Sequence, residues 1–328
     1  MSLSAAAARP PTALVDMETL GGDRIRVSKR DAKCRFDQLS LPPGMRKLFG
    51  RPRLTCGDIL RWTDMSASEL ASSMPKGARV GCDVVIWPLC TSWPMGFAWS
   101  SFIAQSKLLS CCTAAGLTTE RMLSDDLPTP ADLLAVFALA TDDVMLFTLG
   151  DAEHAVPWLD ALDGAIADAG IQAHDKKAVT AQLNETVIGI DVVDGRYLTP
   201  HAPKLAKALA GSLFFLSDRR ASRLEVGAIL GHQGWFALMA RATFACFHDI
   251  YAYGCSASDT RAASERMMAG PSAMSGLSDG STTNLGGDAS ARCTVSKQAA
   301  VEILLFNVLT PLLEVDLSRD WQDHLVAC

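Results

Sequence analysis

Two apolar runs separated by a short acidic break constrain the fold of this chain most strongly. Residues 133–140 are almost wholly apolar, Thr141-Asp142-Asp143 interrupts the run, and residues 144–149 resume it. Apolar runs around a short polar break predict a β-hairpin. Such a hairpin would carry two adjacent carboxylates, those of Asp142 and Asp143, at its tip.

These adjacent carboxylates are the first candidate for chemistry. Like charges side by side raise each other's pKa, so keeping both ionised away from water is costly. A divalent cation relieves this cost, and Mg²⁺ is commonly bound by one or two carboxylates together with substrate phosphates. Two such ions stabilise the attacking and leaving oxygens of a phosphoryl displacement. The alternative is a solvated turn, because aspartate is a common turn residue.

A further carboxylate, that of Asp31, follows a short predicted strand containing Ile25 and Val27. An aspartate at a strand end can project its side chain to where a hairpin tip meets it. Phe36, five positions later, would then wall the same site. The alternative is a surface aspartate with Phe36 in the core.

The third motif is a turn at residues 93–96, with Pro94 and Gly96, which leads into a predicted helix over residues 97–109. Free N–H groups at a helix start can bind an anion, and a glycine lets the backbone approach a ligand closely. Ser100 and Gln105 are polar positions on this otherwise apolar helix. The alternative is a purely structural helix start.

Composition excludes several classes of protein. The net charge of −6 excludes a globally basic nucleic-acid coat, although residues 1–61 hold twelve Lys and Arg against six Asp and Glu, which permits local contact with a polyanion. The ten cysteines lack metal-binding spacing, as is typical of reduced thiols in an intracellular compartment, cytoplasmic or nuclear. No apolar run approaches the ~18 residues of a membrane span, so no membrane partner is expected.

In their order, the three motifs resemble the palm of reverse transcriptases (RNA-directed DNA polymerases), particularly those of retroelements of the tyrosine-recombinase, DIRS-like type. Asp31 with Phe36 matches the first motif of that family. Residues 94–105 match the second, and Asp142-Asp143 matches the third.

The segments that follow the hairpin extend the resemblance. Residues 170–177 fit a segment that begins with glycine and ends with lysine, and residues 187–190 fit loosely a Leu-Gly hairpin of the family. Residues 224–241 look like the thumb of the same elements. The chain end from residue 321 resembles the lead into a ribonuclease H-like domain.

The resemblance implies an α+β fold, in which a palm made of a small antiparallel sheet with helices precedes a mostly helical thumb or connection. The expected divisions of the chain are a flexible lead-in over residues 1–23, the palm over 24–200, a thumb-like helical region over 201–255, a Gly/Ser-rich linker over 256–296, and over 297–328 the start of a connection to an absent ribonuclease H-like domain.

The resemblance also implies a role for each matched residue. The metal-binding and catalytic carboxylates would be Asp31, Asp142 and Asp143, holding Mg²⁺ or Mn²⁺. Lys177 would donate a proton to the leaving pyrophosphate. Contacts to dNTP and to the RNA or DNA template-primer would come from Phe36, as a gate against a 2′-hydroxyl, and from Pro94, Gly96, Ser100, Gln105 and Gly189. The rest of a retroelement polyprotein would be a further partner.

Two other interpretations of the function remain to be considered. Ala140 stands where the family has an aromatic residue before the Asp pair, and the segment before Asp31 is short for the fingers subdomain. Both features favour the alternative of a catalytically decayed or domesticated remnant that acts as a binding or scaffold module. An unrelated α/β enzyme is disfavoured, because the sequence has neither a phosphate-binding lysine loop nor a Gly-x-Ser-x-Gly elbow.

Overall fold

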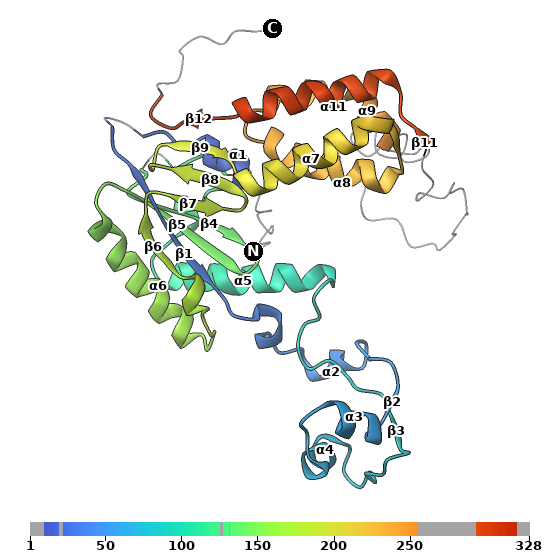
Figure 1. Cartoon of the computed structure of the whole chain (residues 1–328). Helices are drawn as coiled ribbons and strands as arrows, with labels where there is room; N and C mark the ends of the chain where they lie inside the picture. Colours follow the sequence, from blue (N-terminus) through green and yellow to red (C-terminus); the bar gives the residue numbers. More distant parts are fainter. Residues whose placement is uncertain (1–9, 20–21, 125–126, 131, 255–292, 320–328) are drawn as a thin grey trace, which may run out of the picture.

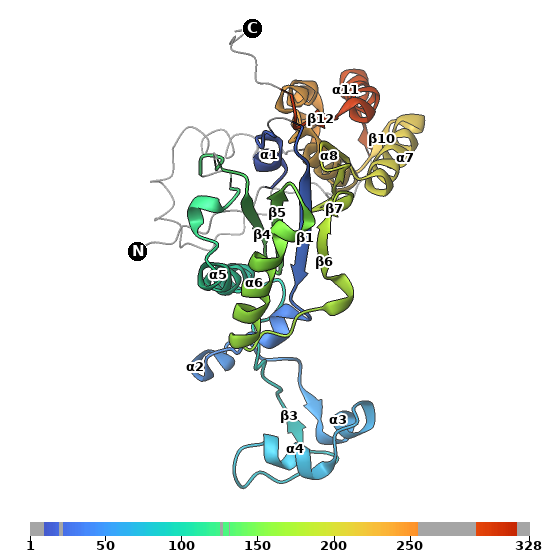
Figure 2. The ribbon, with the colours of Figure 1, turned by 90° about the vertical axis from the view of Figure 1, so that its left-hand side faces the viewer.

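The computed structural model describes residues 10–19, 22–124, 127–130, 132–254 and 293–319 (Figure 1). Within them, a four-stranded sheet carries two helices on one face, and a second four-stranded sheet packs on its other face. A bundle of helices adjoins the second sheet, and a small lobe projects from the opposite end of the molecule (Figures 1 and 2).

The central sheet is antiparallel, with strand order β4-β5-β1-β6. Its strands are β1 (Ile25–Asp31), β4 (Ala135–Ala140), β5 (Asp143–Leu149) and β6 (Val179–Gln182). β4 and β5 form the hairpin that the two apolar runs predicted, so this prediction is confirmed. β1 pairs with β5 over the whole length of both strands, which brings a segment remote in sequence beside the hairpin.

Alternation of side chains along the strands divides the central sheet into two faces. The face that bears Phe137 and Leu146 packs on α5 (Ala98–Ala114) and α6 (Val156–Asp168), where Leu162 is fully buried. Figure 2 shows these helices side by side against the sheet. Each large apolar side chain buried here contributes about 1.5–3 kcal/mol to the free energy of folding, so this layer stabilises the sheet.

The opposite face of the central sheet, which bears Val27 and Phe147, packs on the second antiparallel sheet through buried Val187, Ile190 and Leu198. The second sheet has strand order β12-β9-β8-β7. Its strands are β7 (Glu185–Val187), β8 (Ile190–Val193), β9 (Tyr197–Pro200) and β12 (Val315–Asp316). Because both faces of the central hairpin are covered, its strands are apolar almost without interruption.

The N-terminal segment differs from the flexible lead-in expected over residues 1–23. Within the described residues, α1 (Pro10–Val15) is a short helix, and Leu14 and Met17 are buried in the same core as Phe147. The Thr19 N–H donates to the carbonyl of Leu317 at 2.7 Å. Burial of these apolar residues orders the segment, and this corrects the expectation for residues 10–19.

The helical bundle contains α7 (Ala202–Asp218), α8 (Arg223–Ala237), α9 (His248–Gly254) and α11 (Lys297–Leu309). Phe236, Phe247 and Phe306 are buried at its centre. A two-stranded sheet of β10 (Arg220–Ala221) and β11 (Cys293–Thr294) joins the start of α8 to the segment before α11. The mostly helical character expected after residue 201 is thus present in the described residues.

A 3₁₀ segment, Arg241–Cys246, separates α8 from α9. The expected linker over residues 256–296 falls largely outside the described residues. None of the helices in the described ranges combines the length and apolar character needed to cross a bilayer.

The projecting lobe is built from short elements between β1 and α5. They are α2 (Pro43–Arg46), β2 (Leu54–Thr55), α3 (Cys56–Trp62), α4 (Ala67–Ser73) and β3 (Val85–Ile86). The sequence over residues 55–80 is typical of a loop with one short helix, whereas the structure has two helices there. Each begins with a capping box, Thr55 with Asp58 and Ser66 with Glu69. Reciprocal side-chain hydrogen bonds of this kind start a helix without a strong apolar pattern.

The remaining elements are short 3₁₀ segments that connect the layers. They are η1 (Arg35–Gln38), η2 (Thr119–Arg121), η3 (Ala152–Ala155), η4 (Asp175–Lys177) and η7 (Thr310–Leu312). η1 and η4 flank the end of β1, where the candidate site lies.

Candidate functional site

Asp31 and Asp143 stand opposite each other on neighbouring antiparallel strands. Asp31 is the last residue of β1, Asp143 is the first residue of β5, and the two are register partners. Directly opposed residues point to the same face, with Cβ atoms about 4.5–5.5 Å apart. The structure therefore brings these two candidate residues together at one end of the central sheet.

Asp142 lies in the tight turn between β4 and β5. Thr141, before it, has a left-handed backbone conformation with φ 54°, which is rare for a β-branched residue. The Ala32 N–H donates to the Asp142 carbonyl at 3.1 Å, so the turn is tied to the residue that follows Asp31. Backbone strain of this kind is often found at functional sites.

The three carboxylates form a strongly negative cluster. Burial raises the pKa of Asp143 to about 6, and the negative charges of Asp142 and Asp31 add to this effect. Burial likewise raises the pKa of Asp142, again with a contribution from Asp31. Ionising all three groups is therefore costly, and a cation bound between them would lower that cost.

Two cations lie close to this cluster. The Lys177 ammonium is ion-paired with the Asp31 carboxylate, a contact that raises the pKa of Lys177. Arg35 is 2% exposed, donates from Nη2 to the Ala104 carbonyl at 3.4 Å, and has a buried Nε without a partner in the described structure. Burial lowers the pKa of Arg35, while the charge of Asp142 acts in the opposite direction.

A pocket of about 380 Å³ opens beside the carboxylates, between the end of the central sheet and β7. Asp31 and Asp143 line it together with Lys29, Lys177 and Thr186. The Lys29 ammonium donates to Glu185, another lining residue, and to the Thr186 carbonyl at 3.0 Å. The pocket thus combines carboxylates with ammonium groups, a combination suited to a phosphate ester that arrives with a divalent cation.

The donor set fits a cation shared with a ligand better than one held by protein alone. In the described part of the chain, no group of three or more His, Cys, Asp or Glu side chains is arranged to hold a metal ion. Mg²⁺ is usually bound by one or two carboxylates plus substrate phosphates, however, and does not need a complete protein cage. The opposed pair Asp31 and Asp143 satisfies this requirement.

Phe36 lies in η1 and packs against the buried cluster of Leu39, Leu41 and Trp93. It does not belong to the lining of the 380 Å³ pocket. The structure thus gives Phe36 a packing role, and its expected role as a gate stays a prediction.

The turn before α5 has the geometry that its sequence predicted. Gly96 has φ 89°, a conformation that favours glycine. Ser100 is fully buried, and its hydroxyl donates to the Pro94 carbonyl at 2.8 Å. Ser100 therefore fixes the turn to the helix, and its expected contact to substrate stays a prediction. Ligand contacts by Pro94, Gly96 and Gln105 stay predictions.

Gly189 occupies the turn between β7 and β8, with φ 85°. A Cβ atom at this position would lie 2.6 Å from the Lys204 Nζ, so a larger residue would displace that side chain. The neighbouring Ile188 carbonyl accepts a hydrogen bond from the Trp235 indole N–H at 3.0 Å. The predicted primer-binding hairpin is thus attached to α8 of the bundle.

The sequence analysis did not identify several residues of the site. Lys29 precedes Asp31 by two positions on the same strand, so strand periodicity alone placed it on the same face. Glu185 and Thr186 reach the pocket through the tertiary contact between the two sheets, and Arg35 comes near Asp142 through the fold of η1 against α5. No local signal in the sequence marks these three.

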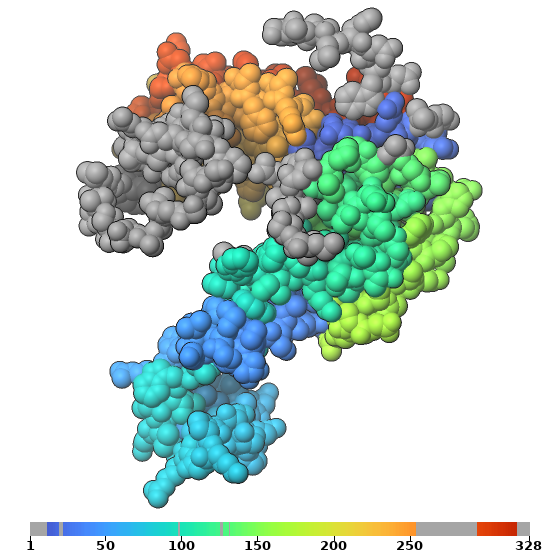
Figure 3. All heavy atoms as spheres, turned by 180° about the vertical axis from the view of Figure 1, so that it is seen from behind, coloured from blue at the N-terminus to red at the C-terminus, as the bar shows by residue number. Residues whose placement is uncertain are grey.

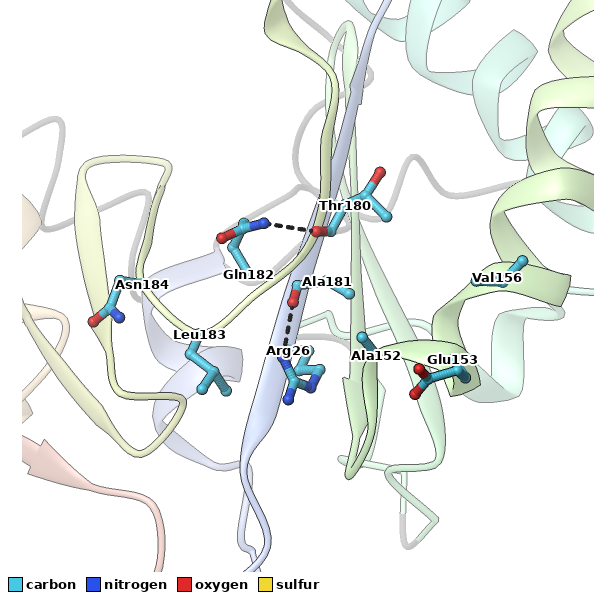
Figure 4. Close-up of a pocket in the computed structure, with 9 residues that line it drawn as sticks. All are labelled: Arg26, Ala152, Glu153, Val156, Thr180, Ala181, Gln182, Leu183 and Asn184. Carbon is cyan, nitrogen blue, oxygen red and sulfur yellow. Dashed lines mark hydrogen bonds between the residues drawn. The ribbon is translucent and has the colours of Figure 1, made fainter.

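A second pocket, of about 510 Å³, lies beside the edge strand β6 (Figure 4). Its wall includes Arg26, whose Nε donates to the Gly150 carbonyl at 2.7 Å and whose Nη1 donates to the Ala181 carbonyl at 3.1 Å. These contacts tie the ends of β5 and β6 together. The Arg26 guanidinium therefore stabilises the sheet. This second pocket is separate from the carboxylate cluster, because Asp31, Asp142 and Asp143 are not among its lining residues.

Comparisons with known proteins give only distant likenesses. No protein-family model matches the sequence, and no curated protein does. Among solved structures, a foamy viral protease-reverse transcriptase in complex with double-stranded DNA is 12% identical with a TM-score of 0.44, covering 78% of this chain and 37% of that one. The same viral protein in complex with an RNA/DNA hybrid is also 12% identical with a TM-score of 0.44, covering 79% and 28%. This chain therefore spans well under half the length of those proteins.

Proposed function

We propose that this chain is the palm and thumb region of a template-directed nucleotidyltransferase of the reverse transcriptase type, derived from a retroelement. The observation that carries the proposal is the opposition of Asp31 and Asp143 on adjacent strands, with Asp142 in the adjoining turn. Helices α5 and α6 support the other face of this sheet. The combination supports a two-carboxylate platform for phosphoryl transfer.

The proposed substrates are a dNTP and a primer on an RNA or DNA template. Asp31 and Asp143, with Asp142 beside them, would hold Mg²⁺ or Mn²⁺ together with the substrate phosphates, and the cation would neutralise the triphosphate and lower the pKa of the primer 3′-hydroxyl. The chain itself supplies position, because both strands that carry the carboxylates are anchored in the buried core.

Lys177 has a twofold part in this proposal. Without a cation at Asp31, its ammonium neutralises the carboxylate. With a cation at Asp31, the ammonium, whose side chain is 61% exposed beside the pocket, would be free to face the phosphates of a bound dNTP. There it can protonate the leaving pyrophosphate, as a general acid near a phosphate ester.

Primer extension with the whole chain tests the proposal. With Mg²⁺ or Mn²⁺, dNTPs and a primed RNA, Asp31→Asn and Asp142→Asn should each lower extension at least ~100-fold, equivalent to about 3 kcal/mol of transition-state stabilisation. Asp160→Asn, an exposed carboxylate on α6, is the matched control and should leave extension unchanged. Extension that persists in the Asp142→Asn variant would remove the metal-site assignment.

A binding or scaffold module that has lost catalysis is the second candidate. The observation that favours it is the ion pair between Lys177 and Asp31, which already neutralises one carboxylate of the cluster. Calorimetric titration with Mn²⁺ separates the two functions. A remnant binds Mn²⁺ no better than its Asp31→Asn variant, whereas the polymerase proposal requires tighter binding by the unaltered chain and tighter binding still by Lys177→Met.

A further inference from the structure

The outer part of the projecting lobe, residues 51–91, has almost no core of its own. Over residues 51–91, all of which the structure describes, only Cys56 and Leu70 are buried. Figure 3 shows the lobe standing apart from the sheet and the bundle. A segment of this size with so few buried side chains lacks the burial that normally stabilises a domain, which indicates that another surface completes it.

The lobe contains an apolar groove of about 1020 Å³. Residues that would normally be buried line it in an exposed state: Trp87 is 65% exposed, Leu89 48%, Val85 44% and Met65 38%. Contiguous exposed apolar surface of this kind marks an interaction site in most proteins. Met65 and Met74 add flexible thioethers that adapt to the shape of a partner.

The charge of the groove limits what can occupy it. Its only ionisable lining residues are Arg46 and Arg79, and none of the described lining residues carries a carboxylate. Neither arginine takes part in an ion pair within the described ranges. The carboxylates of Asp58 and Glu69 accept hydrogen bonds inside their own capping boxes. An occupant that complements this surface is apolar and bears acidic groups.

We propose that this groove binds an amphipathic helix of a partner protein, with apolar side chains in the groove and acidic side chains against Arg46 and Arg79. Helices dock in this way by inserting side chains spaced three or four positions apart into an apolar channel. The site is independent of the carboxylate cluster, since none of the groove residues lines the pocket beside Asp31.

Two other occupants fit less well. A second copy of this chain docked through the same groove would bring the arginines of both grooves into one interface without a lining carboxylate to pair with them, which like charges oppose. Single-stranded nucleic acid is bound by successive aromatic side chains on which bases stack. The groove offers one aromatic residue, Trp87, among aliphatic and sulfur-containing neighbours.

The test is selection from a displayed library of helical peptides of about 16 residues, with apolar residues at helical spacing and either Glu or Lys at the polar positions. The whole chain is the target, and the enriched peptide is then measured by fluorescence anisotropy. Acidic amphipathic peptides should be enriched. Trp87→Ala and Arg79→Glu should each weaken their binding at least ~10-fold, since buried aromatic and arginine contacts dominate such interfaces.

Trp62→Ala is the matched control, because this tryptophan is 69% exposed in the same lobe but outside the groove. It should leave peptide binding unchanged, and circular dichroism should show that all variants remain folded. Enrichment of basic peptides, no enrichment, or binding that survives Trp87→Ala and Arg79→Glu would overturn the proposal. So would binding of an oligo(dT) probe that depends on these two residues while acidic peptides fail to bind.

Discussion

The central sheet and the projecting lobe are stabilised in opposite ways within one chain. In the sheet, β4 is buried from Ala135 to Leu139, and β1 pairs with β5 along its entire length. In the lobe, the helices depend on capping boxes and only two side chains of residues 51–91 are buried. Burial of a large side chain contributes about 1.5–3 kcal/mol, whereas an N-cap contributes about 1.

This difference explains where the two candidate sites lie. A cluster of carboxylates must be held against its own repulsion, and the rigid sheet end provides that support. A docking groove benefits from adaptable walls, and the lobe provides them. The predictions below test whether the sheet and the lobe differ in stability as their burial implies.

The largest effect is expected in the sheet. Phe137→Ala removes a ring with 0% exposure from the face of β4 that packs on α5 and α6. It should lower the free energy of unfolding by about 3–5 kcal/mol, measured by urea denaturation. Trp62→Ala in the lobe should change it by less than ~0.5 kcal/mol, as exposed substitutions do. Equal losses in both variants would contradict the comparison.

A smaller effect is expected for the one leucine buried in the lobe. Leu70→Ala should cost about 2 kcal/mol, at the low end for buried leucines, because few neighbours surround it. The Leu70→Ala substitution should promote local unfolding of the lobe. Hydrogen exchange should therefore accelerate at amides of α3 and α4, while amides of β5 keep their protection. Faster exchange throughout β5 would show that the lobe and the sheet unfold as one unit.

The carboxylate cluster gives a pH-dependent effect. Since the folded-state pKa of Asp143 is raised to about 6, the native state binds more protons than the unfolded state below that pH, and stability falls as pH rises through this range. Asp143→Asn should therefore raise the free energy of unfolding at neutral pH by about 1 kcal/mol, after allowance for solvent screening. The gain should vanish near pH ~3, where the carboxyl group is mostly protonated in both states. A gain independent of pH would point to packing instead.

The smallest effect is expected at a helix cap of the lobe. Ser66 accepts a hydrogen bond from the Glu69 N–H at 3.2 Å and starts α4. Ser66→Ala should reduce stability by about 0.5–1 kcal/mol, seen as faster amide exchange confined to α4. Ser72→Ala is the control, because this exposed serine lies later in the same helix and its hydroxyl donates to the Glu69 carbonyl, away from the cap, so it should have little effect.

The sequence predicted the central hairpin and the strand that ends at Asp31 because their signals are local and strong. Two apolar runs around a short acidic break predicted the hairpin of β4 and β5, and a short apolar strand before Asp31 predicted the position of the remaining carboxylate. The same reasoning missed α1 as an ordered helix and the second helix of the lobe, α4. Their stabilising contacts are either tertiary, as for Leu14 against Phe147, or confined to a cap, as for Ser66 with Glu69.

The sequence by itself determined which residues end β1 and form the turn before β5, because strand periodicity and turn chemistry act over a few neighbouring positions. Only the tertiary structure decided that Asp31 and Asp143 are register partners, that Lys177 reaches Asp31 and that Arg35 is buried near Asp142. Pairing between distant strands depends on how whole faces bury against each other. No short stretch of sequence carries that information.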